Sequence, residues 1–210
     1  PFAELISFMP IEVLQAFVIL MVAMVALGTV LDMAHKKNAK YFFINYKKAS
    51  ESATKKVSAG EKAAVISKTI ASDILTTSEL GRGQRRAAHL LGMYGSILFW
   101  ICSAVLIFAY TGVAKDAPYQ VSALWHMGAL MTCLGGYWFW FFLRVDVSAE
   151  ANPWKRIIRA DLFVLSLLAA ATFGLAWSYT QYAGIPIFDS LFLVLYVLSN
   201  IVLFGGVYWS

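Results

Sequence analysis

Five long apolar segments limit what this chain can fold into. A helix that crosses the hydrocarbon core of a bilayer, about 30 Å thick, needs about 20 predominantly apolar residues. None of the segments alternates polar and apolar residues with a period of two, which is the pattern of a transmembrane β-strand. Since a backbone in lipid must satisfy its own hydrogen bonds, the segments are predicted to be helices. They cover residues 11–33, 87–112, 121–143, 157–179 and 188–208.

The composition agrees with a membrane protein of several spans. Hydrophobic residues make up 60% of the chain and charged residues 14%. A soluble domain has about 45–50% apolar and about 25% charged residues. We therefore predict an all-α polytopic membrane protein with five transmembrane helices, forming a single membrane domain over residues 1–210.

The two cysteines, Cys102 and Cys133, both lie inside apolar segments and form no CxxC motif. A thiolate-bound iron–sulfur cluster or a Cys-rich zinc site therefore has no ligand set in this chain. The cysteines are predicted to be small buried core residues, and no metal site is predicted.

The basic residues predict an orientation in the membrane. All but one of the 17 Lys and Arg residues lie in the segments 34–86 and 144–159, and the exception is Lys115. Loops rich in Lys and Arg stay in the cytoplasm, and a loop shorter than about 60 residues counts fully toward this rule. We therefore expect an N-terminus outside and a C-terminus in the cytoplasm.

The loop over residues 34–86 is expected to be a basic cytoplasmic region containing one amphipathic helix. Ser58 and Glu61 have the spacing of a capping box, which marks a helix N-terminus. Ala63, Ile66, Ile70 and Ile74 follow at intervals of three or four residues. This apolar stripe must pack on the membrane surface, on a partner protein or over the ends of the transmembrane helices. The lysines favour anionic lipid headgroups or an acidic partner.

The stretch 81–95, GRGQRRAAHLLGMYG, allows three interpretations. A phosphate-binding loop would need a preceding strand and a third glycine where Arg86 stands, so nucleotide binding is disfavoured. A haem would need paired histidines, and His89 and His126 should lie roughly 20 Å apart across the bilayer. A His35–His89 pair is geometrically compatible with one haem. Two-haem cytochrome b families use four helix-borne histidines, which this chain lacks, so haem b is disfavoured.

The third interpretation is favoured: Arg82, Arg85 and Arg86 anchor the cytoplasmic end of the second span. His89 then lies one turn inside the helix, beside the arginines. This position suits contact with a quinone carbonyl or a proton relay, and it also suits a plain interfacial histidine. The candidate cofactor-binding residues, for a quinone or a haem, are His35, Arg85, Arg86 and His89. No catalytic residue is predicted.

Polar residues inside the spans give little support to a transporter. Transporters place charges or broken helices at mid-depth and contain inverted repeats, whereas most charged residues here lie near span ends. The pairs Gly135–Gly136 and Gly205–Gly206 are expected to allow close helix packing.

Four segments together resemble the membrane-anchor protein associated with dissimilatory adenylylsulfate reductase in sulfur-metabolising bacteria. The resemblance covers most of the chain and rests on no catalytic motif. The chain departs from related quinone-interacting membrane subunits, because it has no CxxC ferredoxin segment and lacks a set of haem histidines. The segments are residues 27–37 (LGTVLDMAHKK), 85–89 (RRAAH), 124–130 (LWHMGAL) and 135–147 (GGYWFWFFLRVDV).

The resemblance implies a multi-pass protein of the bacterial inner membrane. It would dock a soluble flavin and iron–sulfur oxidoreductase at the cytoplasmic face and link that enzyme to the quinone pool. Two alternatives stay open: a structural accessory subunit without a redox site, bound to other membrane subunits, and a small-solute transporter. The expected partners are the lipid bilayer and a redox enzyme or other membrane subunits, with no nucleic acid.

Overall fold

The structure is a computed structural model, which describes residues 2, 5, 9–54, 57–80, 83–110, 117–144 and 153–206. Every regular element in these ranges is a helix, so the all-α prediction is confirmed for them. Four helices are long and apolar enough to cross a membrane, as a multi-pass membrane protein requires. They are α1 (Ile11–Lys36), α4 with its continuation η4 (Gln84–Val105 and Leu106–Tyr110), α6 (Asp161–Ala183) and α7 (Pro186–Gly205).

The predicted span over residues 121–143 is helical but less apolar than the other four. It consists of α5 (Tyr119–Trp138) and a π-helical continuation, η5 (Phe139–Leu143). It is not among the four candidate spans found in the described residues. The fifth span therefore stays a prediction. Residues 111–112 and 207–208, at the ends of two other predicted spans, lie outside the described residues.

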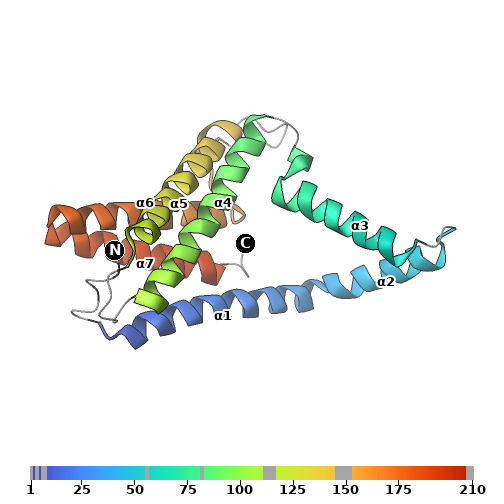
Figure 1. Ribbon diagram of the computed structural model, residues 1–210, viewed down its shortest axis with the longest axis horizontal. Helices are drawn as coiled ribbons and strands as arrows, with labels where there is room; N and C mark the ends of the chain where they lie inside the picture. Colours follow the sequence, from blue (N-terminus) through green and yellow to red (C-terminus); the bar gives the residue numbers. More distant parts are fainter. Residues whose placement is uncertain are drawn as a thin grey trace.

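The four C-terminal helices form a bundle, and α1 runs along one side of it (Figure 1). α4 packs on α5, α6 packs on α7, and α5 joins the two pairs by packing on α6. α1 touches the bundle mainly through α7. A Cβ at Gly205 of α7 would lie 2.8 Å from Cε of Met24, so this glycine allows close packing as predicted. The same prediction for Gly206 is wrong, because nothing lies within 4 Å of its Cβ position.

The core of the bundle consists of large rings packed against small residues. Trp125, Trp177 and Phe99 have 0% of their surface exposed. The rings of Phe99 and Trp125 lie 4.9 Å apart, close enough for a favourable aromatic contact. Cys102 is buried as predicted, and Cys133 is half-buried; both are free thiols.

Glycines bring α4 and α5 to within backbone contact. A Cβ at Gly128 would lie 2.6 Å from the backbone nitrogen of Phe99, and one at Gly135 would lie 2.5 Å from the carbonyl oxygen of Ala88. No side chain fits at such distances, so these positions require glycine. The prediction that Gly135 allows close packing is confirmed. Small residues at membrane helix interfaces permit this approach and the van der Waals contact that holds such helices together.

Helices α2 (Asn38–Glu51) and α3 (Ala59–Thr69) extend away from the bundle (Figure 1). Lys37 separates α1 from α2 and has left-handed backbone angles, φ 54° and ψ 23°. α2 then continues in nearly the direction of α1, and α3 runs back toward the start of α4. A π-helical segment, η2 (Ile70–Leu75), and a short 3₁₀ turn, η3 (Ser78–Leu80), complete the return. We call α2, α3 and η2 together the arm.

The helix predicted after Ser58 is present, with its capping box. The backbone N–H of Ser58 donates to Glu61 Oε2 at 2.9 Å, and the backbone N–H of Glu61 donates to Ser58 Oγ at 3.2 Å. The isoleucines that follow do not pack on the bundle: Ile66 is 59% exposed and Ile74 58% exposed. What their apolar side chains contact therefore stays a prediction.

Candidate functional site

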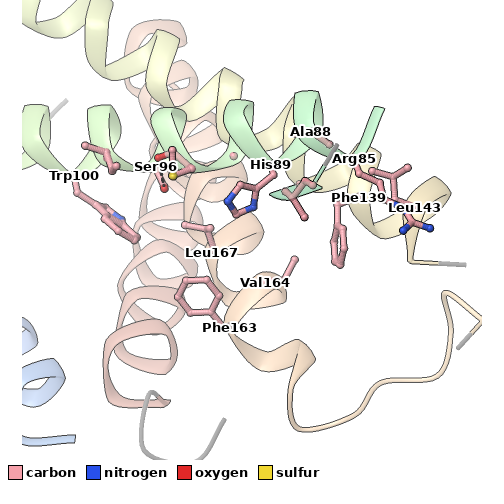
Figure 2. Close-up of a pocket in the computed structure, with 16 residues that line it drawn as sticks. Arg85, Ala88, His89, Ser96, Trp100, Phe139, Leu143, Phe163, Val164 and Leu167 are labelled. Atoms are coloured by element: carbon pink, nitrogen blue, oxygen red, sulfur yellow. Dashed lines mark hydrogen bonds between the residues drawn. The ribbon is translucent and has the colours of Figure 1, made fainter. Parts of the chain in front are cut away.

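A cavity of about 500 Å³ opens between α4, α5 with η5, and α6. Cavities of roughly 300–1,000 Å³ are the usual size for small-molecule sites. Figure 2 shows α4 along one side of the space and side chains of α6 opposite. The lining residues are Leu80, Arg85, Ala88, His89, Gly92, Met93, Ser96, Ile97, Trp100, Gly135, Gly136, Phe139, Leu143, Phe163, Val164 and Leu167.

Two of the four predicted site residues, Arg85 and His89, line this cavity together. They lie four residues apart on α4, so they share one face of the helix. In Figure 2 the His89 ring projects from α4 into the space, opposite Val164 and Leu167 of α6. Arg85 lies at one end of the cavity, and Trp100 lies at the other.

The other two predicted residues, Arg86 and His35, lie elsewhere. Nε of Arg86 donates to the carbonyl oxygen of Thr76 at 2.7 Å, which ties the end of the arm to α4. His35 is exposed on the last turn of α1 and does not line the cavity. Figure 1 shows this end of α1 well apart from the start of α4. Arg82, the third predicted anchor, lies outside the described residues.

The cavity is apolar except at a few points. Ser96 Oγ already donates to the carbonyl oxygen of Met93 at 3.0 Å. Nε1 of Trp100 is buried and has no hydrogen-bond partner among the described residues. No group of three His, Cys, Asp or Glu side chains in the described residues could hold a metal ion. The arrangement suits a flat apolar molecule with a hydrogen-bonding oxygen near His89.

A buried ion pair between Arg144 and Asp161 closes the connection from η5 to α6 beside the cavity. Arg144 donates through Nε to Asp161 Oδ1 at 3.1 Å and through Nη2 to Asp161 Oδ2 at 2.5 Å. It also donates to the carbonyl oxygens of Pro153 and Arg156, at 3.1 and 2.6 Å. Its guanidinium lies 4.3 Å from the centre of the Trp140 ring, within cation–π range.

Sequence reasoning missed this pair. Each of its charged residues stands at the edge of an apolar segment, where it suggests an interfacial anchor. The available signal was that Arg144 directly follows the span predicted over residues 121–143, while Asp161, of opposite charge, lies near the start of the span predicted over residues 157–179. Since Leu143 directly precedes Arg144 and lines the cavity near Arg85 (Figure 2), the pair lies beside the end of the cavity at which Arg85 lies.

His126 has a structural role away from the cavity. Its Nδ1 lies 2.7 Å from the carbonyl oxygen of Ser122, and its Nε2 lies 2.8 Å from Ser178 Oγ on α6. A carbonyl only accepts, so Nδ1 carries the proton and Nε2 accepts from the serine. His126 therefore joins α5 to α6.

A second cavity, of about 270 Å³, lies between α1, α4 with η4, and α7. Its polar side chains are Ser103, Tyr196 and Asn200. Two of them are hydrogen-bonded: Ser103 Oγ accepts from Trp125 Nε1 at 2.8 Å, and Asn200 Nδ2 donates to the carbonyl oxygen of Tyr196 at 2.8 Å. Trp100 lines this cavity as well as the first.

The arm carries exposed rings among lysines. Phe42 and Phe43 of α2 are each 65% exposed, and the ring of Phe42 stacks on Tyr46 with centroids 6.4 Å apart. Phe42 contacts both Phe43 and Tyr46, and a contiguous exposed apolar patch is typical of a surface that binds a membrane or another protein. Lys40, Lys47 and Lys48 lie on the same helix and are exposed.

Hydrogen bonds stabilise the segment from η2 to the start of α4. Hydrogen bonds from the hydroxyls of Ser72 and Ser78, each at 2.7 Å, keep the pKa of Asp73 below its ordinary value of 3.8. Tyr94 of α4 donates through its hydroxyl to the carbonyl oxygen of Leu75 at 2.6 Å. The arm is therefore attached to the helix that carries His89.

Comparison of the chain with protein-family models, with curated proteins and with solved structures found no match.

Proposed function

We propose that this chain is a membrane anchor subunit that docks a cytoplasmic flavin and iron–sulfur oxidoreductase and links it to the quinone pool. The proposal includes five spans in a bacterial inner membrane, with α5 as the fifth, the N-terminus outside and the C-terminus in the cytoplasm. The distribution of Lys and Arg supports this orientation. The resemblance to the membrane anchors of adenylylsulfate reductase supports the choice of partner.

The arm supports the docking role. If α1 crosses the bilayer, the 14 residues of α2 reach about 20 Å beyond its end. Phe42 and Phe43 lie in the first half of α2, about 6–8 Å from its start, and a partner protein that docks on α2 would bury their rings. The lysines around them favour a partner surface rich in Asp and Glu.

The cavity at His89 is the observation that carries the quinone role. Its volume and apolar walls fit a quinone ring, and the imidazole of His89 can donate a hydrogen bond to a carbonyl oxygen. The same imidazole can take up or release the proton that quinone reduction or oxidation requires. The Arg85 guanidinium favours negative charge that develops on the ring oxygen. A haem held by two histidines does not fit, because His89 is the only histidine among the residues that line the cavity.

The test compares two histidine variants in membranes containing the docked enzyme. His89→Ala is expected to reduce quinone-linked turnover by about 10²-fold or more, the scale of losing one positioned proton-transfer group. Docking should stay unchanged, because His89 lies on α4 and not on the arm. The matched control is His35→Ala, which removes the same side chain outside the cavity. Wild-type turnover in His89→Ala would exclude the quinone role.

A structural accessory subunit without a redox site is the second candidate, and the exposure of α1 favours it. Most of α1 is uncovered by the described bundle, with Ile19, Val22 and Leu27 each at least 60% exposed. Such a face can pack against helices of other membrane subunits. This candidate predicts that turnover tolerates His89→Ala, so the same experiment separates the two functions.

A further inference from the structure

The two cavities lie along one face of α4. From Arg85 to Ile107, the α4 and η4 residues that line them recur every three or four positions, which places them on one stripe of the helix. The stripe is about 33 Å long, from 22 steps of 1.5 Å. This length is close to the roughly 30 Å thickness of the hydrocarbon core.

Trp100 stands where the cavities meet. It is the residue that lines both, and in Figure 2 it lies at the end of the first cavity opposite Arg85. Its ring lies 5.5 Å from that of Phe204, which lines the second cavity.

The chemistry of the tract changes from one end to the other. The first cavity has Arg85 and His89 at one end, whereas the second is lined by aliphatic and aromatic side chains such as Leu14, Val18 and Leu193. Ser103 and Asn200 of the second cavity already have hydrogen-bond partners within the protein. A molecule with a polar ring and a long apolar chain matches this change.

We propose that the two cavities form one binding tract for a long-chain isoprenoid quinone, with the ring beside His89 and the chain running past Trp100 into the second cavity. This inference rests on the proposed quinone role and adds a site for the chain between α1 and α7. The site gives α1 a function: its loose packing against the bundle leaves the space that the chain fills. Trp100 would then discriminate between quinones that carry a long isoprenoid chain and quinones that carry none.

The tract is tested with the full chain in lipid nanodiscs and two probes: a benzoquinone without a chain, and the same ring with a long isoprenoid chain carrying a photoreactive diazirine near its end. After illumination, mass spectrometry maps the attachment sites. The chain is expected to label α1 and α7 at residues such as Val18 and Leu193, and excess unlabelled long-chain quinone should prevent it. Labelling only on lipid-facing residues such as Val194 would overturn the inference.

A cavity-filling variant gives an independent test. Val197→Trp places a large ring in the second cavity, and Val194→Trp places the same ring on the exposed face of α7 as a matched control. Val197→Trp should weaken binding of the long-chain quinone about tenfold or more, because many chain atoms lose their packing contacts, and leave the chainless ring unaffected. Equal affinities of wild type and Val197→Trp for the long-chain quinone would contradict the tract.

Other occupants and orientations give different results. A phospholipid with a diazirine in its acyl chain that labels the second cavity, and is not displaced by quinone, would show a lipid site and overturn the inference. The chainless quinone could instead lose binding in Trp100→Phe and keep it in His89→Ala. That result would place the ring beside Trp100 rather than His89 and would also overturn the inference. If the chainless ring binds in a His89-dependent manner but the chain lies elsewhere, only this inference fails. If the ring does not bind, the quinone role itself fails.

Discussion

Arg144 and Asp161 form a buried, two-point ion pair between the end of η5 and the first residue of α6, with 8% of each residue exposed. The pair also holds the backbone between them, since Arg144 donates to the carbonyl oxygens of Pro153 and Arg156. The backbone N–H of Ile158 donates to Asp161 Oδ2 at 2.8 Å. Residues 153–161 beside the cavity are therefore held around one guanidinium and its counter-charge.

Removing one member of this pair should destabilise the protein strongly. Asp161→Asn leaves a buried guanidinium without its counter-charge, a change that costs about 3–5 kcal/mol. Thermal unfolding in detergent, monitored by tryptophan fluorescence, measures the loss, and Arg159→Ala in the same connection is the exposed control. If Asp161→Asn unfolded at the wild-type temperature, the pair would not hold the connection.

Gly128→Ala should separate α4 from α5. Its new Cβ would lie 2.6 Å from the backbone nitrogen of Phe99, so a helix must move. Overpacking of this kind costs about 1–3 kcal/mol. Gly92→Ala is the control on α4, because nothing lies within 4 Å of its Cβ position and alanine suits a helix better. Equal stability of both variants, measured by thermal unfolding, would contradict the close contact described here.

Arg86→Ala should loosen the arm without changing the cavity. The substitution removes the bond to the carbonyl oxygen of Thr76, and we expect amide hydrogens of residues 70–80 to exchange about tenfold faster, which corresponds to about 1.4 kcal/mol. Arg85→Ala is the control: the Arg85 side chain lines the cavity, so its removal should leave this exchange unchanged. Hydrogen exchange with mass spectrometry reports both. Faster exchange in both variants alike would show that Arg86 is not a specific tether.

Low pH should destabilise the turn around Asp73. Because hydrogen bonds from Ser72 and Ser78 lower the pKa of the carboxylate, they stabilise the turn above pH 3.8 and are lost as the pH falls through the lower folded-state value. Hydrogen exchange of residues 72–78 should therefore accelerate only in that acidic window. Asp73→Asn should remove this pH dependence, whereas Glu79→Gln on η3 should keep it. An unchanged profile in Asp73→Asn would contradict the assignment.

The sequence was most informative where local chemistry decides structure. Apolar runs of the right length predicted four candidate spans, and the capping box predicted the start of α3 from Ser58 and Glu61. The sequence placed His89 one helical turn inside the second span beside the arginines, and of these residues Arg85 and His89 both line the cavity. These signals lie within one or two helical turns, so no tertiary information is needed to read them.

The rest depends on contacts between residues far apart in the chain. Arg86 lies next to Arg85, yet it bonds to the arm, because neighbouring helical positions point about 100° apart. His35 was grouped with His89 by its expected side of the membrane, and the direction of α1 separates the two. Arg144 and Asp161 are separated by 17 positions, and only the fold shows that they meet.

The central claim is that this chain anchors a redox enzyme, and purification from native membranes in mild detergent tests it most directly. Mass spectrometry then identifies every protein that remains bound in fixed ratio. The account predicts a soluble flavin and iron–sulfur enzyme, released when Phe42 and Phe43 are both replaced by Ser. Recovery of integral membrane subunits alone, unaffected by that replacement, would contradict the account and leave the chain as an accessory scaffold.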